Sequence, residues 1–295
     1  MPRRNLADLP LPAAQYRLTQ FDWFEPKASS RAEDRERIKR GRLTVKADKS
    51  APRKVRRLLK KLEKAEARGK APKTQASAIY MRRLRNRIVG QILALIERAS
   101  FGRVARFDGV PRGWEFTPDE LDGQDPRKLV ATVRKDLYDA GAKDADGWLI
   151  AFLHGEYEPE TGSYRVHYHG VAAGGMIDVV RALKGLPKYK NRAEPDGSPD
   201  PVKCRLRVSR KPLTNIAYRV AYILKSYWTC RRLGPVGQEG EVKRTRRSQR
   251  IPEPHHSRLL AWLDQWRLQD MALIMKISVT SDGFVISRKS KGEDR

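Results

Sequence analysis

The sequence predicts an α+β fold, organised around one long β-hairpin with flanking helices and preceded by a basic helical extension. Residues 148–172 contain two runs of apolar, aromatic and β-branched residues on either side of a turn cluster at 159–162, a pattern typical of a β-hairpin. From about residue 101, strand-like and helix-like patterns follow one another, as in a compact domain of mixed structure. We expect a largely helical extension at 1–100, a compact domain at 101–232, and a linker, helix and terminal hairpin at 233–295.

Local periodicity and end signals predict the remaining elements. An amphipathic helix opens at Asp125-Pro126 and closes before Gly141, because proline is favoured in a first helical turn and glycine just after a last one. The first 30 residues carry apolar side chains without periodicity, and either dock on a domain or are disordered alone. The other expected elements are strands at 102–107, 113–118 and 202–209, helices at 177–186, 213–230 and 258–275, and a hairpin with strands at 277–279 and 284–286.

The charge of the chain indicates a polyanionic partner. Its 295 residues include 62 Lys and Arg against 35 Asp and Glu, which gives a formal net charge of +27. Nucleic acid is the expected partner, since no apolar run approaches the roughly 20 residues that span a bilayer. The first 12 residues lack the apolar core of a signal peptide, so we expect a cytoplasmic protein. Cys204 and Cys230 form no Cys-x-x-Cys motif, and no zinc ribbon or disulfide scaffold is indicated.

Two N-terminal helical patterns carry many of the positive charges. They cover residues 53–64 and 80–99. Their basic surfaces either track nucleic-acid phosphates or are simply solvated, and the charge of the whole chain favours phosphate binding. Such contacts position a protein on DNA but read no base sequence. The residues that we expect to bind DNA are Arg53, Lys54, Arg56, Arg57, Lys60, Lys61, Arg82 and Arg83.

Three of the five histidines fall in the predicted hairpin. Alternate side chains of a strand share a face, so His167 and His169 point the same way. If the turn contains four residues, His154 lies opposite His167 and Glu156 lies opposite Arg165, all on the face of His169. Three imidazoles and one carboxylate would then lie within side-chain reach of one another.

This group of side chains predicts a site for a divalent metal ion. Imidazole and carboxylate groups bind Mn²⁺, or Mg²⁺ where water completes the coordination shell. We expect His167 and His169 as ligands with Glu156 as the third. His154 could replace Glu156, orient another ligand, or only pack. The alternative for the whole group is that histidines on a half-buried strand merely pack or hydrogen-bond.

A second candidate site lies in the helical pattern at 213–230. Tyr218, Tyr222 and Lys225 are spaced by four and three residues, so they share one face of the predicted helix. A tyrosine hydroxyl is a weak nucleophile at neutral pH, and a lysine one turn away would stabilise the negative charge of a transition state. The alternative is that the tyrosines are core aromatics and that Lys225 extends from the helix edge to solvent.

The order of these parts resembles the HUH endonuclease superfamily. This superfamily includes the rolling-circle replication initiators (Rep proteins) of plasmids and single-stranded DNA phages, the relaxases and some transposases. Its first motif, a strand that ends near Phe-Thr, is similar to residues 114–118, and its second, two histidines around a hydrophobic residue, matches 167–169. Its third motif, Tyr-x-x-Lys on a helix, matches 222–225. The resemblance covers residues 101–232.

One detail departs from the phage-type members of this superfamily. Some members carry two tyrosines four residues apart, as Tyr218 and Tyr222 are. In the phage type each tyrosine precedes its own lysine at the third position, whereas here Ala221 stands where the first lysine would be. The resemblance therefore implies Tyr222 as nucleophile with Lys225 beside it, and Tyr218 as a further candidate.

The resemblance also implies a fold and an activity. The fold is a central antiparallel sheet with helices on its faces, the histidines on central strands and the tyrosine helix across the sheet. The activity is site- and strand-specific nicking and joining of DNA through a 5′-phosphotyrosine bond, which initiates rolling-circle replication. A metal held by Glu156, His167 and His169 would polarise the scissile phosphate, and a free 3′ hydroxyl would prime host polymerase.

Other functions stay open at this point. A relaxase or single-strand transposase would use the same chemistry. A non-enzymatic, basic nucleic-acid-binding protein would have purely structural histidines, and would bind DNA in a salt-sensitive way without a covalent adduct. No helicase P-loop of the type Gly-x-x-x-x-Gly-Lys-Ser/Thr occurs in the sequence, so unwinding of origin DNA would depend on a host helicase.

Overall fold

The computed structural model describes residues 5–47, 52–99, 101–191, 202, 204–236, 242–244 and 248–287, with the backbone alone at 233–236 and 242–244. Its centre is a sheet with strand order β5–β1–β4–β3–β6, in which β2 also pairs with β4 and β9 also pairs with β3. All these pairs are antiparallel except β3 with β6, so the central sheet is mixed rather than wholly antiparallel. Its strands are β1 (Val104–Gly109), β2 (Glu115–Phe116), β3 (Trp148–Glu158), β4 (Ser163–Ala173), β5 (Leu206–Val208), β6 (Thr229–Cys230) and β9 (Ala272–Met275).

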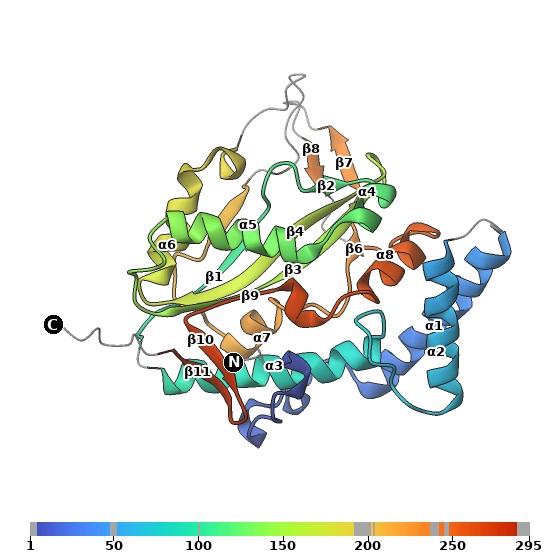
Figure 1. Cartoon of the computed structure of the whole chain (residues 1–295), viewed down its shortest axis with the longest axis horizontal. Coiled ribbons are helices and arrows are strands. Elements are labelled where there is room, and N and C mark those ends of the chain that lie inside the picture. The colour runs from blue at the N-terminus through green and yellow to red at the C-terminus, as the bar shows by residue number, and fades with distance from the viewer. Residues whose placement is uncertain are drawn as a thin grey trace.

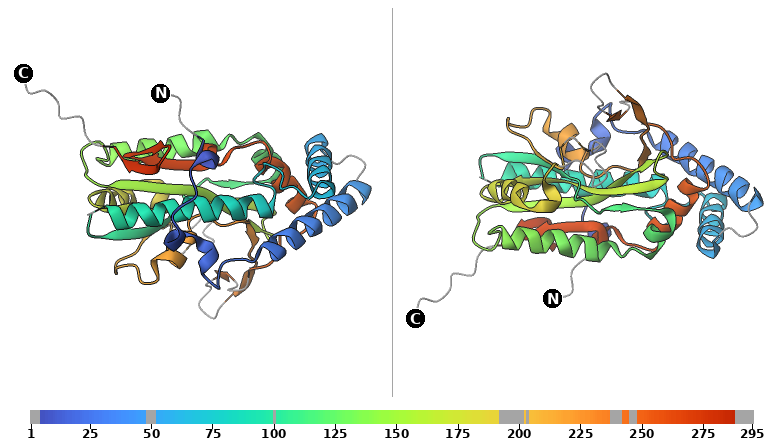
Figure 2. Two further views of the ribbon diagram at one scale, coloured as in Figure 1. Left: turned by 90° about the horizontal axis from the view of Figure 1, so that it is seen from below. Right: turned by 90° about the horizontal axis from the view of Figure 1, so that it is seen from above.

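Helices cover both faces of this sheet (Figures 1 and 2). One layer contains α5 and the opposite layer contains α3, while α1 and α2 lie together beyond one end of the sheet. Two separate two-stranded sheets are formed by β7 (Leu233–Val236) with β8 (Val242–Arg244) and by β10 (Ile277–Thr280) with β11 (Gly283–Ile286). The helices are α1 (Lys27–Ala47), α2 (Arg53–Ala67), α3 (Ala78–Arg98), α4 (Pro118–Gly123), α5 (Pro126–Asp139), α6 (Met176–Ala182), α7 (Ile216–Ala221) and α8 (His255–Leu263). None of the helices in the described ranges is long and apolar enough to cross a bilayer.

The hairpin of β3 and β4 forms in the register that the sequence predicts. Glu158 pairs with Ser163, and the pairing continues through His154 opposite His167. Gly162 in the turn has a φ of +62°, a left-handed conformation that glycine adopts at little cost. Every residue of both strands is buried, which agrees with a central position between two helical layers.

The two faces of this hairpin belong to two different cores. On the face that we call the α5 face, Leu149, Leu153 and Tyr168 pack with side chains of α5, α6 and α8. On the opposite face, which we call the α3 face, Trp148 and Ile150 pack with α3, α7 and the N-terminal residues. This is the arrangement that strand geometry requires, because successive side chains of a strand point to opposite faces.

The N-terminal residues dock on α3. Three 3-10 turns at Leu6–Asp8, Ala14–Tyr16 and Leu18–Gln20 lead along this helix, and Leu6, Leu9 and Leu18 are buried in the same core. A Cβ atom added to Gly90 of α3 would lie 2.4 Å from Pro12, so the arm approaches the helix at a place that only glycine allows. The predicted N-terminal extension therefore packs through α3 into the core of the α3 face. The boundary expected at residue 100 does not separate two independent cores.

Several expected elements have different bounds in the structure. The predicted helix at 258–275 is wrong in its second half: α8 ends at Leu263, and Ala272–Met275 forms strand β9, which pairs with β3. Four consecutive apolar residues fit a buried strand as well as a buried helix, because they carry no period. The helix expected at 213–230 is only Ile216–Ala221, and the strands expected at 113–118 and 202–209 shorten to Glu115–Phe116 and Leu206–Val208.

Other elements agree with the sequence prediction. Asp125 caps the N-terminus of α5 by accepting a hydrogen bond from the amide of Arg127, and Pro126 occupies the first turn. The terminal hairpin is confirmed as β10 and β11. The first expected strand is β1, displaced by two residues toward the C-terminus. The expected helix at 177–186 is α6, followed by a 3-10 turn at Leu183–Gly185.

Candidate active site

Along the α3 face, the hairpin changes from apolar to polar at its middle. On β3, Trp148, Ile150 and Phe152 are followed at the same spacing by His154 and Glu156. On β4, Val171 and Ala173 are preceded by Arg165, His167 and His169 on that same face. We call these two stretches the apolar half and the polar half of the α3 face. Because both are buried, the polar half must satisfy its polar atoms by specific contacts.

The three histidines of the polar half form one cluster. One ring nitrogen from each of His154, His167 and His169 lies within 4.8 Å of the others, and all three residues are buried. The Nε2 atoms of His167 and His169 are only 3.1 Å apart. The cluster arises directly from the register, since His154 and His167 face each other across the two strands and His169 is the next residue on that face.

Hydrogen bonds assign the tautomer of each ring. The carboxylate of Asp108 accepts a hydrogen bond from Nδ1–H of His169 at 2.6 Å, which leaves a lone pair on Nε2 of His169. The carbonyl of Tyr227 accepts from Nε2–H of His154 at 2.8 Å, so the lone pair of His154 is on Nδ1. The carbonyl of Arg165 accepts from Nδ1–H of His167 at 3.2 Å, which leaves the lone pair of His167 on Nε2. Each imidazole therefore offers one nitrogen as an electron-pair donor.

This arrangement fits a bound divalent metal ion. The Nε2 atoms of His167 and His169 lie 3.1 Å apart, close enough for one cation to bind both. Among the described residues, Nδ1 of His154 is buried without a hydrogen-bond partner, and such an atom normally requires one. Burial lowers the pKa of His154 far below its ordinary value and also lowers that of His169. Neutral imidazoles are the form that binds metal.

Asp108, on β1, orients the imidazole of His169 through its hydrogen bond to Nδ1. It lies opposite His169 in the pairing of β1 with β4, and it also contacts Arg106 at 2.9 Å. Burial opposes ionisation of Asp108, but the hydrogen bond from His169 and the nearby positive charges outweigh it, so the pKa of this carboxyl lies below its ordinary value. An ionised carboxylate behind a ligating histidine fixes the ring and makes the opposite nitrogen more basic. Asp108 is not among the site residues predicted from the sequence.

Tyr222 lies directly beside the histidine cluster. Its ring centroid is 4.9 Å from that of His169, in an edge-to-face arrangement. The ammonium of Lys225 lies 4.2 Å from the Tyr222 ring centroid, and the guanidinium of Arg106 lies 4.8 Å from it. The predicted candidates Tyr222 and Lys225 are thus brought to the predicted histidines, together with a second cation from β1.

The segment that carries Tyr222 is shorter and tighter than a regular helix. After α7 ends at Ala221, the amides of Ile223 and Leu224 bond to carbonyls three residues earlier, at 3.1 and 3.4 Å. The chain then reaches the edge of β3, where Trp228 packs against Gly155 so closely that an added Cβ would lie 2.2 Å from the indole. Trp228 belongs to the core of the α5 face, so this segment runs around the edge of the sheet.

Glu156 takes a different position from the one expected. Its carboxylate forms an ion pair with Arg231 at 3.0 Å, and the group of potential metal ligands is made of the three histidines. Glu156 was expected as third ligand ahead of His154, whereas the geometry favours His154. The physical reason is that Glu156 lies next to Thr229 of β6, and the chain after β6 supplies the arginine that neutralises it.

The other predicted site residues lie elsewhere. Tyr218 is 48% exposed and contacts the ring of Trp23 edge-to-face at 5.4 Å. Arg82 donates to the carbonyl of Glu25 at 2.6 Å and so helps to hold the N-terminal arm. The predicted DNA-binding residues of α2 are on a helix that packs against α1 and α8, away from the sheet (Figure 1), and Lys61 there pairs with Asp264 at 2.5 Å.

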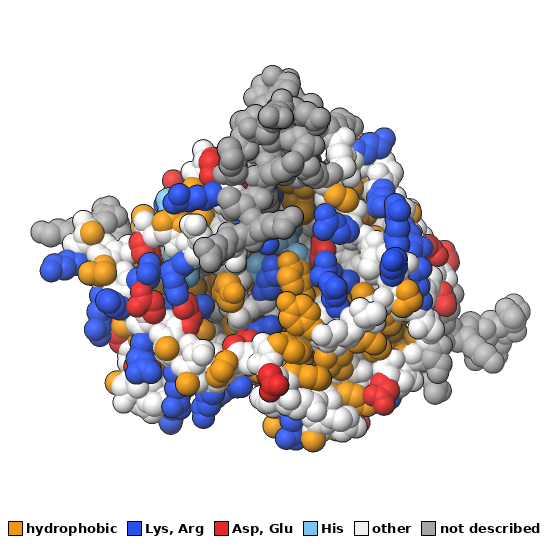
Figure 3. All heavy atoms as spheres, turned by 180° about the vertical axis from the view of Figure 1, so that it is seen from behind, with side chains coloured by type: hydrophobic (Ala, Val, Ile, Leu, Met, Phe, Trp, Pro, Cys, Tyr) orange, Lys and Arg blue, Asp and Glu red, His pale blue; other side chains and the backbone are white. Residues whose placement is uncertain are grey.

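The space-filling view shows how this site meets the surface. On the face opposite to that of Figure 1, histidine side chains are visible in a hollow, with Lys and Arg side chains on both sides and hydrophobic side chains next to them (Figure 3). Positive charges beside an aromatic and apolar surface suit a flexible polyanion whose bases can stack.

Comparison with known protein families, with curated proteins and with solved structures gives no match for this chain. The site must therefore be interpreted from its own geometry and chemistry.

Proposed function

We propose that this protein is a metal-dependent tyrosine endonuclease of the HUH type, which nicks and rejoins single-stranded DNA. One observation carries this proposal: a tyrosine ring with two cations beside it lies against a buried cluster of three histidines. Histidines with a purely structural role would not require the partly exposed Tyr222 beside them, nor a buried Nδ1 of His154 without a hydrogen-bond partner. The net charge of +27 supports a nucleic-acid substrate.

The residues of the site have distinct roles in this reaction. The hydroxyl of Tyr222 forms a bond to the scissile phosphorus, the bond from phosphorus to the 3′ oxygen breaks, and that oxygen takes up a proton. The products are a 5′-phosphotyrosine on Tyr222 and a free 3′ hydroxyl. Lys225 and Arg106 stabilise the negative charge that develops on the phosphate and the phenolic oxygen. Because the phosphotyrosine conserves the bond, the strand can be rejoined without ATP.

His154, His167 and His169 would hold the metal ion. When bound, the ion supplies charge neutralisation and polarisation of the scissile phosphate. Three imidazoles favour Mn²⁺ or another transition metal over Mg²⁺, since Mg²⁺ prefers oxygen ligands. Of the two metals expected from the sequence, we therefore propose Mn²⁺.

The biological role that we propose is initiation of rolling-circle replication of a plasmid or phage. The 3′ hydroxyl released by Tyr222 would prime host polymerase, and a host helicase would unwind the origin. Use of the same chemistry by a relaxase or a transposase would leave the site unchanged, so the role depends on which DNA element carries the cognate nick site.

The decisive experiment is a test for the covalent adduct. The protein is incubated with Mn²⁺ and labelled single-stranded oligonucleotides from the DNA element that encodes it, and the products are separated on denaturing gels. We expect a labelled band at the mass of the protein, which disappears with chelator and with Tyr222→Phe, while DNA binding persists.

A matched control keeps the result interpretable. Tyr138 lies on α5 in the opposite layer and is 51% exposed, so Tyr138→Phe should leave the adduct unchanged. If the wild-type protein binds these oligonucleotides but forms no adduct with any of them, the protein is a non-enzymatic DNA-binding protein and the proposal is wrong.

A further inference from the structure

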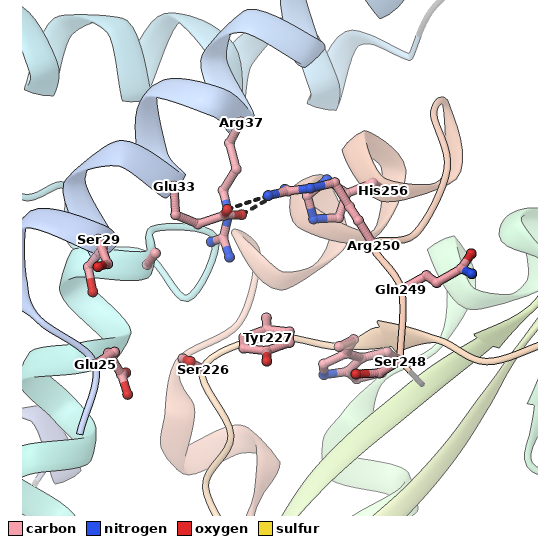
Figure 4. A pocket seen from close by; sticks show the side chains of 13 residues that line it. Glu25, Ser29, Glu33, Arg37, Ser226, Tyr227, Ser248, Gln249, Arg250 and His256 are labelled. Atoms are coloured by element: carbon pink, nitrogen blue, oxygen red, sulfur yellow. Dashed lines mark hydrogen bonds and ion pairs between the residues drawn. The ribbon is translucent and has the colours of Figure 1, made fainter. Parts of the chain in front are cut away.

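A pocket opens between α1 and the segment that follows Tyr222 (Figure 4). Its volume is about 370 Å³, within the range of roughly 300–1,000 Å³ that is usual for small-molecule sites. Ser29 and Arg37 line it from α1, Ser226 and Tyr227 line it from the opposite wall, and Gln249 and Arg250 complete the rim.

The charged groups of this pocket already neutralise one another. Arg37 contacts Glu33 at 2.9 Å and donates to the carbonyl of Ala76 at 2.8 Å. Arg250 contacts the same carboxylate of Glu33 at 2.8 Å, as the dashed lines in Figure 4 show. The lining holds two cations, Arg37 and Arg250, against two carboxylates, Glu33 and Glu25, so the pocket offers little net charge to a ligand. Glu25, which also lines the pocket, is paired with Arg85 of α3. The uncharged polar groups of the lining include the hydroxyls of Ser29 and Ser226 and the amide of Gln249.

The pocket also contains an exposed aromatic ring. Tyr227 is 57% exposed, although it is only five residues from Tyr222 and follows a tightly packed turn. An aromatic ring beside neutral hydrogen-bonding groups suits a flat, uncharged heterocycle, which can stack on the ring and direct its polar edge to the amide and the hydroxyls.

The backbone of Tyr227 connects this pocket to the histidine cluster. Its carbonyl accepts the hydrogen bond from Nε2–H of His154 at 2.8 Å. The residue that offers its ring to the pocket therefore also sets the orientation of a metal-ligating imidazole. A ligand stacked on Tyr227 would therefore lie near the histidine cluster.

We propose that this pocket binds one unstacked base of the single-stranded DNA substrate, next to the scissile phosphate, by stacking on Tyr227. The inference rests on the proposed function for its substrate class. Tyr227 then holds a base at one position beside the nick, the amide of Gln249 and the hydroxyls of Ser29 and Ser226 contact its polar edge, and α1 contributes to the substrate site.

The test uses binding and cross-linking, which need neither metal nor cleavage. The probes are labelled single-stranded oligomers of dA, dC and dT, and an abasic oligomer of the same length, measured by fluorescence anisotropy. We expect wild-type protein to bind at least one base-containing oligomer more tightly than the abasic one. Tyr227→Ala should reduce that affinity about 5- to 150-fold and leave the abasic oligomer unaffected. Tyr227→Trp should restore it, and the exposed control Tyr138→Ala should change nothing.

Cross-linking locates the base directly. An oligomer that contains 5-iododeoxyuridine is bound, irradiated and digested with the protein, and we expect the cross-linked peptide to carry Tyr227. If Tyr227→Ala binds every probe as the wild-type does, or if cross-links form only elsewhere, for example at Tyr218, the pocket proposal is wrong.

The two proposals fail separately. A protein that forms the Tyr222 adduct but does not respond to Tyr227→Ala keeps the nuclease and loses the base pocket. A protein that cross-links through Tyr227 but forms no adduct keeps the base pocket and loses the nuclease.

Discussion

The apolar and polar halves of the α3 face lie on the same two strands and are both buried, yet they contribute differently to the stability of the fold. In the apolar half, Trp148, Ile150 and Phe152 remove apolar surface from water against α3, which stabilises the fold. In the polar half, His154 and His169 bury imidazoles whose charged forms are disfavoured, which contributes little to stability. The difference teaches that the apolar half anchors the sheet, whereas the polar half adds little to stability and carries the residues of the function that we propose.

The largest effect on stability is expected from a substitution in the apolar half. Phe152 is 1% exposed, so Phe152→Ala should lower the free energy of unfolding by about 3–5 kcal/mol, because it removes buried surface and leaves a cavity. Urea denaturation measures this change. His169→Ala is the matched variant in the polar half and should cost much less. Equal losses from the two variants would show that the histidines form a stabilising core after all.

Glu33, on α1 outside the sheet, sharpens the comparison, because this half-buried charged group is expected to stabilise the fold. Burial raises the pKa of Glu33, but Arg250 and Arg37 outweigh this and lower it to about 2. The folded state therefore keeps this carboxylate ionised where the unfolded chain takes up a proton. The stabilisation is complete above the ordinary pKa of about 4.5 and is lost as the pH falls toward 2.

This stabilisation should amount to about 2–3 kcal/mol. Unfolding free energies at pH 7 and pH 3 should differ by less in Glu33→Gln than in the wild-type protein. The same pH dependence in both proteins would assign the acid sensitivity to other carboxylates, including those of the polar half.

A smaller effect is expected behind the histidines. Asp108→Asn should weaken Mn²⁺ binding about 10- to 100-fold, because the ring of His169 loses its charged partner. Titration calorimetry measures the affinity, and circular dichroism should show an unchanged fold. Asp178→Asn on the exposed surface of α6 serves as control. Unchanged Mn²⁺ affinity in Asp108→Asn would mean that Asp108 is only a structural partner of Arg106.

The smallest effect is expected at Tyr218, on α7. Tyr218 contacts Trp23 by its ring, and no contact between Tyr218 and the histidines is found among the described residues. Tyr218→Phe should therefore change the yield of the covalent adduct by no more than about twofold. An adduct that is lost in Tyr218→Phe but kept in Tyr222→Phe would identify Tyr218 as the nucleophile.

The sequence predicts the hairpin and the histidine cluster because both depend on local rules. The turn at 159–162 sets the register, and the two-residue period of a strand then fixes which histidines share a face. Asp108 could not be found in this way, because it is 61 residues from His169 and depends on the pairing of β1 with β4. In the sequence, Asp108 is a single acidic residue in an otherwise strand-like run. It can be connected to His169 only when the pairing of β1 with β4 is known.

The positions of Glu156 and of the tyrosine segment were also beyond local rules. Arg231 comes to Glu156 only because β6 lies beside β3 in parallel. The helix of Tyr222 ends early because Trp228 must reach the space above Gly155 on the other face of the sheet. In both cases a contact between distant segments decides the outcome. The local sequence alone predicts a longer helix around Tyr222 and a metal ligand at Glu156.

Strand β9 has a consequence for the order in which this molecule can be completed. It pairs directly with β3, Ile274 opposite Ile150, although 124 positions of the numbering separate the two residues. On a ribosome, β3 and β4 with their histidines emerge long before Ala272–Met275, so one edge of β3 stays open until β9 has been made. A growing chain therefore cannot finish the sheet under its histidines early, and the DNA-cutting apparatus that we propose matures only after β9 has been made.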